Sequence, residues 1–225
     1  YKRQGYIKEY GSFSPPRYRG FKSMRDFLIN LSQNLSITQN VKVTHLKPHN
    51  EKISVLNDRS NIWETYDAVI STLPAPQNLD LMKKFPILKK TLETASYDAC
   101  IALMFIFDEK PKNIPYFFEY YNQQGMLSWM AAGSNLRFWT AQTKGDYSNK
   151  NIKKDKILLK DEIFQEIEKA IYQLEPNIKI NFHSLHIWKY AKVTKVCSGP
   201  QIDPKFPIVI AGDFMEGENI ESAFS

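Results

Sequence analysis

A glycine and an aspartate follow a short apolar segment near the end of the chain. Residues 208–210 predict a buried strand, and Gly212 just after it has no Cβ, so a ligand can approach the backbone there. The Asp213 carboxylate at the strand end can accept hydrogen bonds from sugar hydroxyl groups. Both residue types are also common in ordinary turns, so the pair alone favours a plain strand and loop.

The residues that follow shift this balance towards ligand binding. After a loop at Gly217, the residues Ile220, Glu221 and Ser222 begin a helical pattern. The first N–H groups of a helix have no partner within the helix, and they carry the positive end of its dipole. They therefore suit the electron-rich edge of a ring, and the whole run favours a strand, a binding turn and a helix start.

A second strand is expected to end in a proline-rich turn. Residues 66–72 are apolar at their centre and run into Leu73, Pro74 and Pro76. Two prolines so close together end the strand and predict an extended turn.

Hydrophobic periodicity predicts two helices. Residues 23–35 carry apolar side chains at helical spacing and predict a helix with one buried stripe. Residues 155–174 predict the strongest helix of the chain, stopped by Pro176. Its predicted apolar face consists of Ile157, Leu158, Phe164, Ile167, Ile171 and Leu174.

The remaining elements are expected to be strands. Residues 41–46 and 52–56 predict a hairpin whose turn contains Pro48, His49 and Asn50. An antiparallel sheet is predicted from the aromatic-rich segments 100–107, 116–121, 126–131 and 136–142, with a further strand at 182–189.

The order of these elements predicts a mixed α/β (α+β) fold with interleaved domains. Residues 21–77 and 199–225 are expected to form a partial Rossmann-like nucleotide-binding domain. Residues 78–198 are expected to form an inserted domain with an antiparallel sheet and a helix, and residues 1–20 to lie at its edge.

Composition narrows the functional classes. The 225 residues carry a net charge of +6, mostly from scattered lysines, with no compact basic stripe for nucleic acid. No apolar run approaches the ~20 residues that span a bilayer. Cys100 and Cys197 are too few and too far apart for a zinc site or a disulfide framework, which favours a reducing, cytoplasmic location and no bound metal.

Several segments together resemble the renalase-like branch of the amine-oxidase superfamily of FAD enzymes. The similar segments are residues 19–24, 43–46, 66–77, 126–129, 186–191 and 211–224. The most specific are DAVISTLPAPQ at residues 67–77 and the run from Gly212-Asp213 to Glu221-Ser222-Ala223-Phe224.

The resemblance implies a two-domain flavoprotein. One half binds FAD in a Rossmann-like domain, and a sheet of the other half covers the isoalloxazine. It also implies an oxidase that transfers a hydride from substrate to flavin N5, after which oxygen reoxidises the flavin and gives hydrogen peroxide. The implied substrates are isomeric reduced nicotinamide dinucleotides, although many relatives are described as amine oxidases.

The resemblance also implies roles for individual residues. Val43 would hold the adenine through its backbone, unless it is an ordinary core valine. Thr72, Leu73 and Pro74 would pass near the adenosine and pyrophosphate at the carboxyl end of a strand. Gly212 and Asp213 would contact the ribityl and pyrophosphate region. The backbone N–H of Ile220 would face the flavin pyrimidine, with Glu221 or Ser222 beside it.

Trp129, His186 and Trp188 are the candidates for the substrate side. Hydride transfer to a flavin needs no protein acid or base when the substrate carries its own driving force, so large aromatic walls would suffice. No catalytic residue is therefore assigned, and His186 is not expected to act as a general base. All three could instead be ordinary core aromatics.

The chain departs from the family pattern in two respects. The final helix, which is expected to continue after Ser225 and complete the contact with the flavin pyrimidine, is missing from these 225 residues. A glycine-rich GxGxxG turn with an acidic partner about 20 residues later is expected in such enzymes, and these 225 residues do not contain it. The chain is therefore expected to be a fragment that does not retain FAD and is inactive by itself.

Two other functions remain open. An amine oxidase would need an aromatic cage, for which Tyr116, Phe117, Tyr120 and Tyr121 are candidates, although adjacent strand residues point to opposite faces. A non-enzymatic α/β binding module is the other possibility. The oligomeric state is left open. The flavin hypothesis requires that the runs around Pro74 and Asp213 meet in space.

Overall fold

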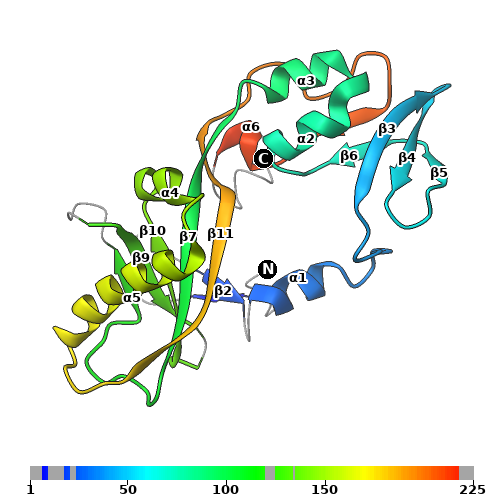
Figure 1. The fold of residues 1–225 in the computed structure, drawn as a ribbon. Helices are drawn as coiled ribbons and strands as arrows, with labels where there is room; N and C mark the ends of the chain where they lie inside the picture. The colour runs from blue at the N-terminus through cyan, green and yellow to red at the C-terminus, as the bar shows by residue number, and fades with distance from the viewer. Residues whose placement is uncertain (1–6, 10–17, 21–23, 120–124, 134, 218–225) are drawn as a thin grey trace. The chain divides into compact units, whose positions relative to one another are not determined.

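The structure is a computed structural model that describes residues 7–9, 18–20, 24–119, 125–133 and 135–217 (Figure 1). Two compact units divide the chain, residues 1–40 and residues 41–225. The first contains an antiparallel pair, β1 (Ile7–Glu9) and β2 (Tyr18–Gly20), followed by helix α1 (Met24–Leu31). The predicted helix is thus confirmed, but its stripe is partly wrong. Phe27 is buried, whereas Leu28 is exposed and Leu35 lies beyond the helix end.

The second unit begins with a three-stranded antiparallel sheet. Its strands are β3 (Val43–His49), β4 (Lys52–Asn57) and β5 (Trp63–Tyr66), in the order β3-β4-β5. The predicted hairpin is confirmed, but Pro48 and His49 belong to β3 and not to the turn. Asn50 makes the turn with a φ of +54°, a left-handed conformation that asparagine tolerates. All four residues of β5 are exposed. The strand therefore lacks the alternation of buried apolar and exposed polar side chains from which a strand is predicted.

Two short strands of the second unit form a parallel pair. Strand β6 (Val69–Ser71) pairs with β12 (Ile208–Ile210), and Ile210 is the register partner of Ser71. The strand predicted at residues 66–72 is therefore too long, because Tyr66 belongs to β5.

Three helical segments follow β6 directly. They are α2 (Ala75–Leu81), the 3-10 helix η1 (Met82–Lys84) and α3 (Pro86–Leu92). The extended turn predicted at residues 73–77 is wrong beyond Pro74, which is the N-cap of α2. Proline is well tolerated in the first turn of a helix because its missing N–H would be unpaired there anyway, so Pro76 helps to start this helix.

One hydrophobic core joins these helices to the parallel pair. Ile208 and Ile210 of β12 and Phe214 pack in it with buried side chains of α2, η1 and α3. The helical members of this core are Ala75, Leu81, Met82, Leu88 and Leu92. Much of the helical segment falls within the range 78–198 that was predicted as an inserted domain, yet its side chains share a core with the parallel strands.

A five-stranded antiparallel sheet forms the second body of residues 41–225. It contains β7 (Ser96–Phe107), β8 (Phe117–Glu119), β9 (Leu127–Ala132), β10 (Phe138–Thr143) and β11 (Ile180–Lys195). The order across the sheet is β11-β7-β10-β9-β8 (Figure 1). The predicted antiparallel sheet is confirmed. The strand β11 is much longer than the predicted 182–189, and register shifts at several points interrupt its alternation.

Helix α5 (Lys156–Tyr172) covers one face of this sheet. The Asp155 carboxylate caps it by accepting hydrogen bonds from the N–H groups of Ile157 (2.8 Å) and Leu158 (3.3 Å). The helix is confirmed, but the predicted apolar face is wrong for Ile157, Leu158 and Leu174, which are 67%, 54% and 40% exposed. Leu174 also lies beyond the end of the helix. The buried residues repeat at strict four-residue spacing, namely Leu159, Ile163, Ile167 and Ile171.

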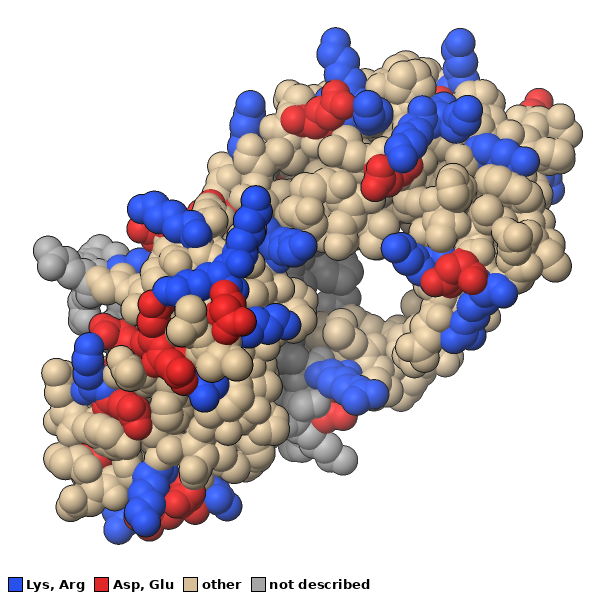
Figure 2. All heavy atoms as spheres, viewed as in Figure 1, with Lys and Arg blue, Asp and Glu red and all other residues tan. Residues whose placement is uncertain are grey.

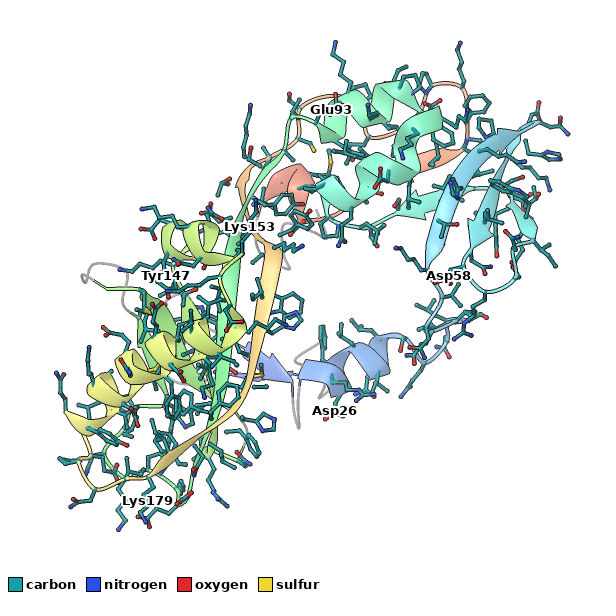
Figure 3. The ribbon with its side chains drawn as sticks, viewed as in Figure 1. Asp26, Asp58, Glu93, Tyr147, Lys153 and Lys179 are labelled. Atoms are coloured by element: carbon teal, nitrogen blue, oxygen red, sulfur yellow. The ribbon has the colours of Figure 1, made fainter. Side chains whose placement is uncertain are left out.

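A short helix, α4 (Gly145–Asn151), precedes α5 in a stretch that the sequence does not predict as helical. Tyr147 projects from α4 (Figure 3), and its hydroxyl donates a hydrogen bond to Glu162 of α5 at 2.9 Å. Lys154 forms an ion pair with the same carboxylate. This link fixes α4 to α5.

The described surface shows mixed charge. Lys and Arg side chains are interspersed with Asp and Glu over the face drawn in Figure 2. Within the described residues, no helix combines the length and apolar character needed to cross a membrane. The same residues hold no group of three or more His, Cys, Asp or Glu side chains suited to a metal ion. Cys100 and Cys197 are both free and buried.

Candidate cofactor-binding site

The carboxyl ends of β6 and β12 lie at one edge of the parallel pair. The Ala211 N–H donates to the Ser71 carbonyl at 3.0 Å, which continues the ladder beyond the last register pair. Because the strands are parallel, the turn after Ser71 and the turn after Ile210 leave the sheet at the same edge. The required meeting of the two distant runs is therefore confirmed.

Tyr97 connects these two turns. The Ala75 N–H donates to the Tyr97 hydroxyl at 3.2 Å, and this hydroxyl donates to Asp213 Oδ1 at 3.3 Å. Burial, with a further contribution from the Asp213 charge, raises the pKa of Tyr97 well above its usual value. The phenol therefore remains protonated at neutral pH and can hold Asp213 in place.

A buried asparagine holds the turn after β6. Asn78 is fully buried in α2, and its Oδ1 accepts a hydrogen bond from the Ser71 hydroxyl. Its Nδ2 donates to the Leu73 carbonyl at 2.6 Å. Residues Thr72 and Leu73 are thus fixed from both sides. The sequence offers only a weak signal for this role, because a single Asn early in a helix carries no motif.

Gly212 is required for reasons internal to the fold. Its φ of +152° is one that side-chain-bearing residues rarely adopt, and a Cβ there would lie 2.8 Å from Cε1 of Phe214. Gly212 precedes α6 (Asp213–Glu216), a single helical turn in which Phe214 is fully buried. Asp213 is half-buried at the first position of this turn, so the predicted strand, turn and helix start are present up to this point.

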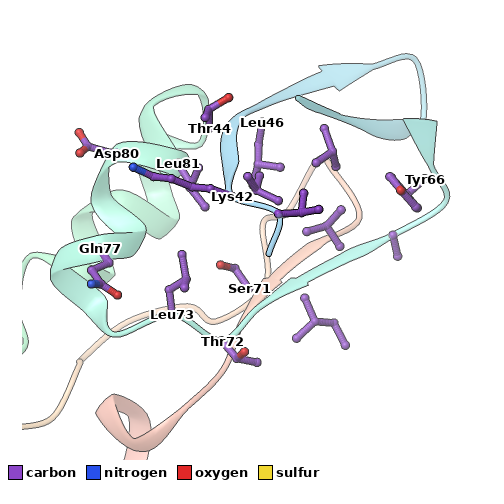
Figure 4. A pocket seen from close by; sticks show the side chains of 16 residues that line it. Lys42, Thr44, Leu46, Tyr66, Ser71, Thr72, Leu73, Gln77, Asp80 and Leu81 are labelled. Atoms are coloured by element: carbon purple, nitrogen blue, oxygen red, sulfur yellow. The ribbon is translucent and has the colours of Figure 1, made fainter. Parts of the chain in front are cut away.

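A cavity of about 960 Å³ opens beside β6, between the three-stranded sheet and α2 (Figure 4). Val43, Thr72 and Leu73 all line it, as three of the predicted cofactor residues. Val43 is 36% exposed and is therefore not an ordinary core valine. Ligand pockets of several hundred cubic ångströms are typical of cofactor sites, so the size is suitable.

The cavity wall is mostly aliphatic with a few polar groups. Its apolar members include Leu46, Val55, Ile70 and Leu81. Its polar members include Lys42 and Gln77, whose side chains make no hydrogen bond or ion pair within the described residues (Figure 4). Such a wall can hold a flat ring and leave polar groups free to orient it.

Not all predicted residues share this cavity. Pro74, Gly212 and Asp213 lie at the strand edge but do not line it. Ile220, Glu221 and Ser222 lie outside the described residues.

The described residues fit the ring and sugar portions of FAD but not its pyrophosphate. None of the first N–H groups of α2 is available to a phosphate, because each either donates within the fold or is absent. Ala75 donates to Tyr97, Pro76 has no N–H, and Gln77 donates to the Pro74 carbonyl at 2.9 Å. No strand in the described part of the chain is followed by a glycine-rich turn and helix that could cradle phosphates.

The substrate-side candidates lie on the five-stranded sheet and do not line the cavity. His186 and Trp188 belong to β11, are both exposed, and have ring centroids 4.3 Å apart. Trp129 of β9 is half-buried and stacks on Phe117 with centroids 6.0 Å apart. None of the three is fully buried, so the alternative of ordinary core aromatics is wrong for His186 and Trp188.

The aromatic cage for an amine is only partly testable. Tyr116 is 50% exposed beside β8, and Phe117 is half-buried against Trp129. Tyr120 and Tyr121 lie outside the described residues.

The chain is similar to several solved structures. Comparison with family models and with curated proteins finds no match. A protein from Exiguobacterium sp. 255-15, provisionally named as a protoporphyrinogen oxidase, superimposes with a TM-score of 0.64 at 13% identity. The match covers 94% of this chain and 51% of that one.

Two other structures give the same result. An oxidoreductase from Methanosarcina mazei has a TM-score of 0.57 at 16% identity, over 92% of this chain and 53% of that one. A CLA-producing fatty acid isomerase from P. acnes has a TM-score of 0.63 at 12% identity, and the match covers 89% of this chain and 49% of that one. The chain thus spans about half the length of these proteins. At such low identity the similarity establishes the fold, and the predicted mixed α/β fold is confirmed.

Proposed function

We propose that the chain is part of an FAD-dependent oxidoreductase of the renalase type, acting on a reduced nicotinamide dinucleotide. One observation carries this proposal. The ends of β6 and β12 meet at one edge, with Asp213 held there by Tyr97, and the same edge adjoins a cavity of about 960 Å³. Two strand ends of an open α/β sheet form the usual place for a nucleotide-like ligand.

Each residue then has a physical role. Tyr97 occupies Oδ1 of Asp213, and Oδ2 makes no hydrogen bond within the described residues, so it can accept one from a ribose or ribityl hydroxyl. Val43 at the start of β3 offers its backbone to the adenine. Thr72 and Leu73, held by Asn78, border the adenosine.

The redox chemistry in this proposal belongs to the cofactor. When bound, FAD would supply the hydride acceptor for the reduced substrate, and its reoxidation by oxygen with uptake of a proton would give hydrogen peroxide. The protein itself needs to bind and orient the cofactor and the substrate, and to exclude water from them. The five-stranded sheet supplies a face with Trp129, His186 and Trp188 for that purpose, and none of these residues is assigned an acid or base role.

The location of this activity is proposed to be cytoplasmic, with a small molecule as substrate and no nucleic-acid or membrane partner. Burial raises the pKa of the Cys100 thiol to about 11, and it also raises the pKa of Cys197. Both are therefore protonated at neutral pH, as expected for structural cysteines in a reducing compartment.

The first test is FAD binding to the purified 225-residue chain. Because no phosphate cradle exists among the described residues, the chain should lose flavin on gel filtration but bind FAD weakly at equilibrium, as measured by flavin fluorescence anisotropy. Asp213→Asn should raise the dissociation constant about 5-fold or more, the effect of one charge-assisted hydrogen bond. The matched variant Glu216→Gln, in the same helical turn, should leave it unchanged. Equal losses in both variants, or no binding by the unmodified chain, would refute the site.

The second test addresses the reaction. A protein that joins this chain to the additional length found in its structural relatives should oxidise reduced nicotinamide isomers and release one peroxide per turnover. Oxidation of amines with no turnover of the dinucleotides would favour an amine oxidase. Tight stoichiometric FAD retention by the 225-residue chain alone would contradict the expectation that it is a fragment.

A further inference from the structure

A side chain closes the hydrogen-bonded pair at the open end of the β3–β4 hairpin. The Asp58 N–H donates to the Lys42 carbonyl at 2.9 Å, as in an ordinary antiparallel ladder. In return, the Lys42 N–H donates to Asp58 Oδ1 at 3.0 Å. The chain turns at Asp58, directly after the last residue of β4, so the carboxylate takes the place of the backbone carbonyl. Asp58 therefore clamps both backbone groups of Lys42.

This clamp determines which way the next residue faces. Val43 pairs with Asn57, directly beside the pair that Asp58 closes. Hydrogen-bonded and non-hydrogen-bonded pairs alternate along an antiparallel ladder, so the Val43 N–H and C=O point away from β4. Strand β3 is an edge strand, and neither Val43 group makes a hydrogen bond within the described residues. One donor and one acceptor therefore stand side by side at an open sheet edge.

This open edge belongs to the cavity beside β6. Val43 and Lys42 line the cavity near the start of β3, and Thr72 lines it from the turn after β6 (Figure 4). Asp58 is exposed and does not line the cavity. Any effect of Asp58 on a ligand there must therefore pass through Lys42 and Val43.

The other side of Val43 offers no comparable support. The register between β3 and β4 shifts after Val43, because Thr44 is an extra residue without a register partner. A bulge of this kind disrupts the ladder and bends the strand. The direction of the Val43 backbone therefore depends on the clamp at Lys42.

We propose that Asp58 is a positioning residue for the nucleotide ligand, which holds the Val43 N–H and C=O towards the base in the cavity. The inference rests on the proposed function, in which Val43 meets the adenine. Adenine presents a ring nitrogen that accepts a hydrogen bond beside an amino group that donates one, which complements the two Val43 groups. Asp58 makes no contact with the ligand itself.

The test is adenosine binding to the 225-residue chain, measured by titration of the backbone amide NMR signals. Asp58→Ala should raise the dissociation constant about 3- to 10-fold, the effect of one hydrogen bond. Asp58→Asn keeps an oxygen that accepts the Lys42 N–H, so its dissociation constant should stay within about 2-fold of that of the unmodified chain.

Thr65→Ala is the matched control for a general loosening of the same sheet. Thr65 and Ser54 share a hydrogen bond of 3.2 Å between their hydroxyl oxygens, and Thr65 does not line the cavity. Its loss should leave adenosine binding unchanged. Equal losses of affinity in Thr65→Ala and Asp58→Ala, or a failure of Asp58→Asn to restore binding, would overturn the proposal.

Hydrogen exchange of single amides gives a readout that needs no ligand. The Lys42 N–H should exchange about 3- to 10-fold faster in Asp58→Ala than in the unmodified chain, and Asp58→Asn should restore its protection. Unchanged exchange in Asp58→Ala would mean that the clamp is absent in solution, and the proposal would fail. With adenosine present, the Val43 N–H should gain protection in the unmodified chain and less in Asp58→Ala.

Failure of this proposal is distinguishable from failure of the proposed function. If the unmodified chain binds no adenosine, the cavity is not a nucleotide site, and the proposed function fails there together with the role of Asp58. If adenosine binds and protects the Val43 N–H equally in the unmodified chain and in Asp58→Ala, the nucleotide site stands and only the role of Asp58 is refuted.

Discussion

The Tyr97 hydroxyl donates a hydrogen bond to Asp213 Oδ1 at 3.3 Å across 116 positions of the sequence. The same hydroxyl accepts the Ala75 N–H at 3.2 Å, so one side chain ties the start of α2 to the start of α6. The carboxylate proposed to bind a sugar hydroxyl is therefore positioned by a residue from β7. Its geometry depends on how β7 enters the core shared by α2, α3 and β12.

Removing this hydroxyl should loosen both turns. Tyr97→Phe leaves the Ala75 N–H and one Asp213 oxygen without a partner while keeping the ring, so the free energy of unfolding should fall by about 1–2 kcal/mol. The measurement is urea denaturation. Tyr190→Phe is the control, because Tyr190 meets Tyr97 through its ring at 5.9 Å and its hydroxyl has no hydrogen-bond partner in the described structure. A loss of equal size in the control would argue against the bridge.

The turn after β6 should depend on Asn78 even more strongly. Asn78→Ala removes two hydrogen bonds from a fully buried position and leaves the Leu73 carbonyl unpaired. The free energy of unfolding should fall by about 2–3 kcal/mol. The exposed Asp80→Asn, in the same helix, should change it by less than about 0.5 kcal/mol. FAD binding should weaken together with stability only if the Thr72–Leu73 turn borders the ligand.

Gly212 should tolerate no side chain. Gly212→Ala combines an unfavourable φ of +152° with a 2.8 Å contact to the Phe214 ring, whereas Gly125→Ala combines a φ of +123° with only an ordinary 3.4 Å contact to Glu166. The first substitution should therefore cost more than the second, by about 1–2 kcal/mol beyond a shared backbone strain of about 1 kcal/mol. Thermal or urea unfolding of both variants measures the difference, and equal values would mean that Phe214 moves aside freely.

Much of the fold follows from local pattern, and the exceptions have physical reasons. The aromatic strands and α5 show clear periodicity, so their existence could be predicted. Helix α2 was missed because Pro74 and Pro76 look like breakers, although proline in a first helical turn is favourable. The length of β11 was missed because its register shifts disrupt the alternation on which strand prediction depends.

Some residues of the candidate site could be predicted from the sequence and others could not. Gly212, Asp213 and Thr72 lie in runs whose residue types suggest ligand binding, so a motif could find them. Tyr97 and Asn78 are single residues with no motif of their own, and their partners are brought to them only by tertiary packing.

The junction of α4 and α5 should make stability depend on pH. The hydrogen bond from Lys154, and then that from Tyr147, lower the pKa of Glu162 below its ordinary value of 4.5. A carboxyl group whose pKa is lower in the folded state contributes stability above its unfolded pKa and loses it as pH falls through the folded value. Stability should therefore decline below about pH 4.5, and part of the decline should be absent in Glu162→Gln.

This contribution should be small, because the Glu162 side chain is 42% exposed and water screens the pair. We expect less than about 1 kcal/mol between pH 7 and pH 3.5, measured by urea denaturation at both values. Glu166→Gln, on the same helix, removes the same charge and should leave the pH dependence of the unmodified protein intact. If Glu162→Gln and the unmodified protein lose stability in parallel on acidification, the Tyr147 and Lys154 contacts do not stabilise the junction in solution.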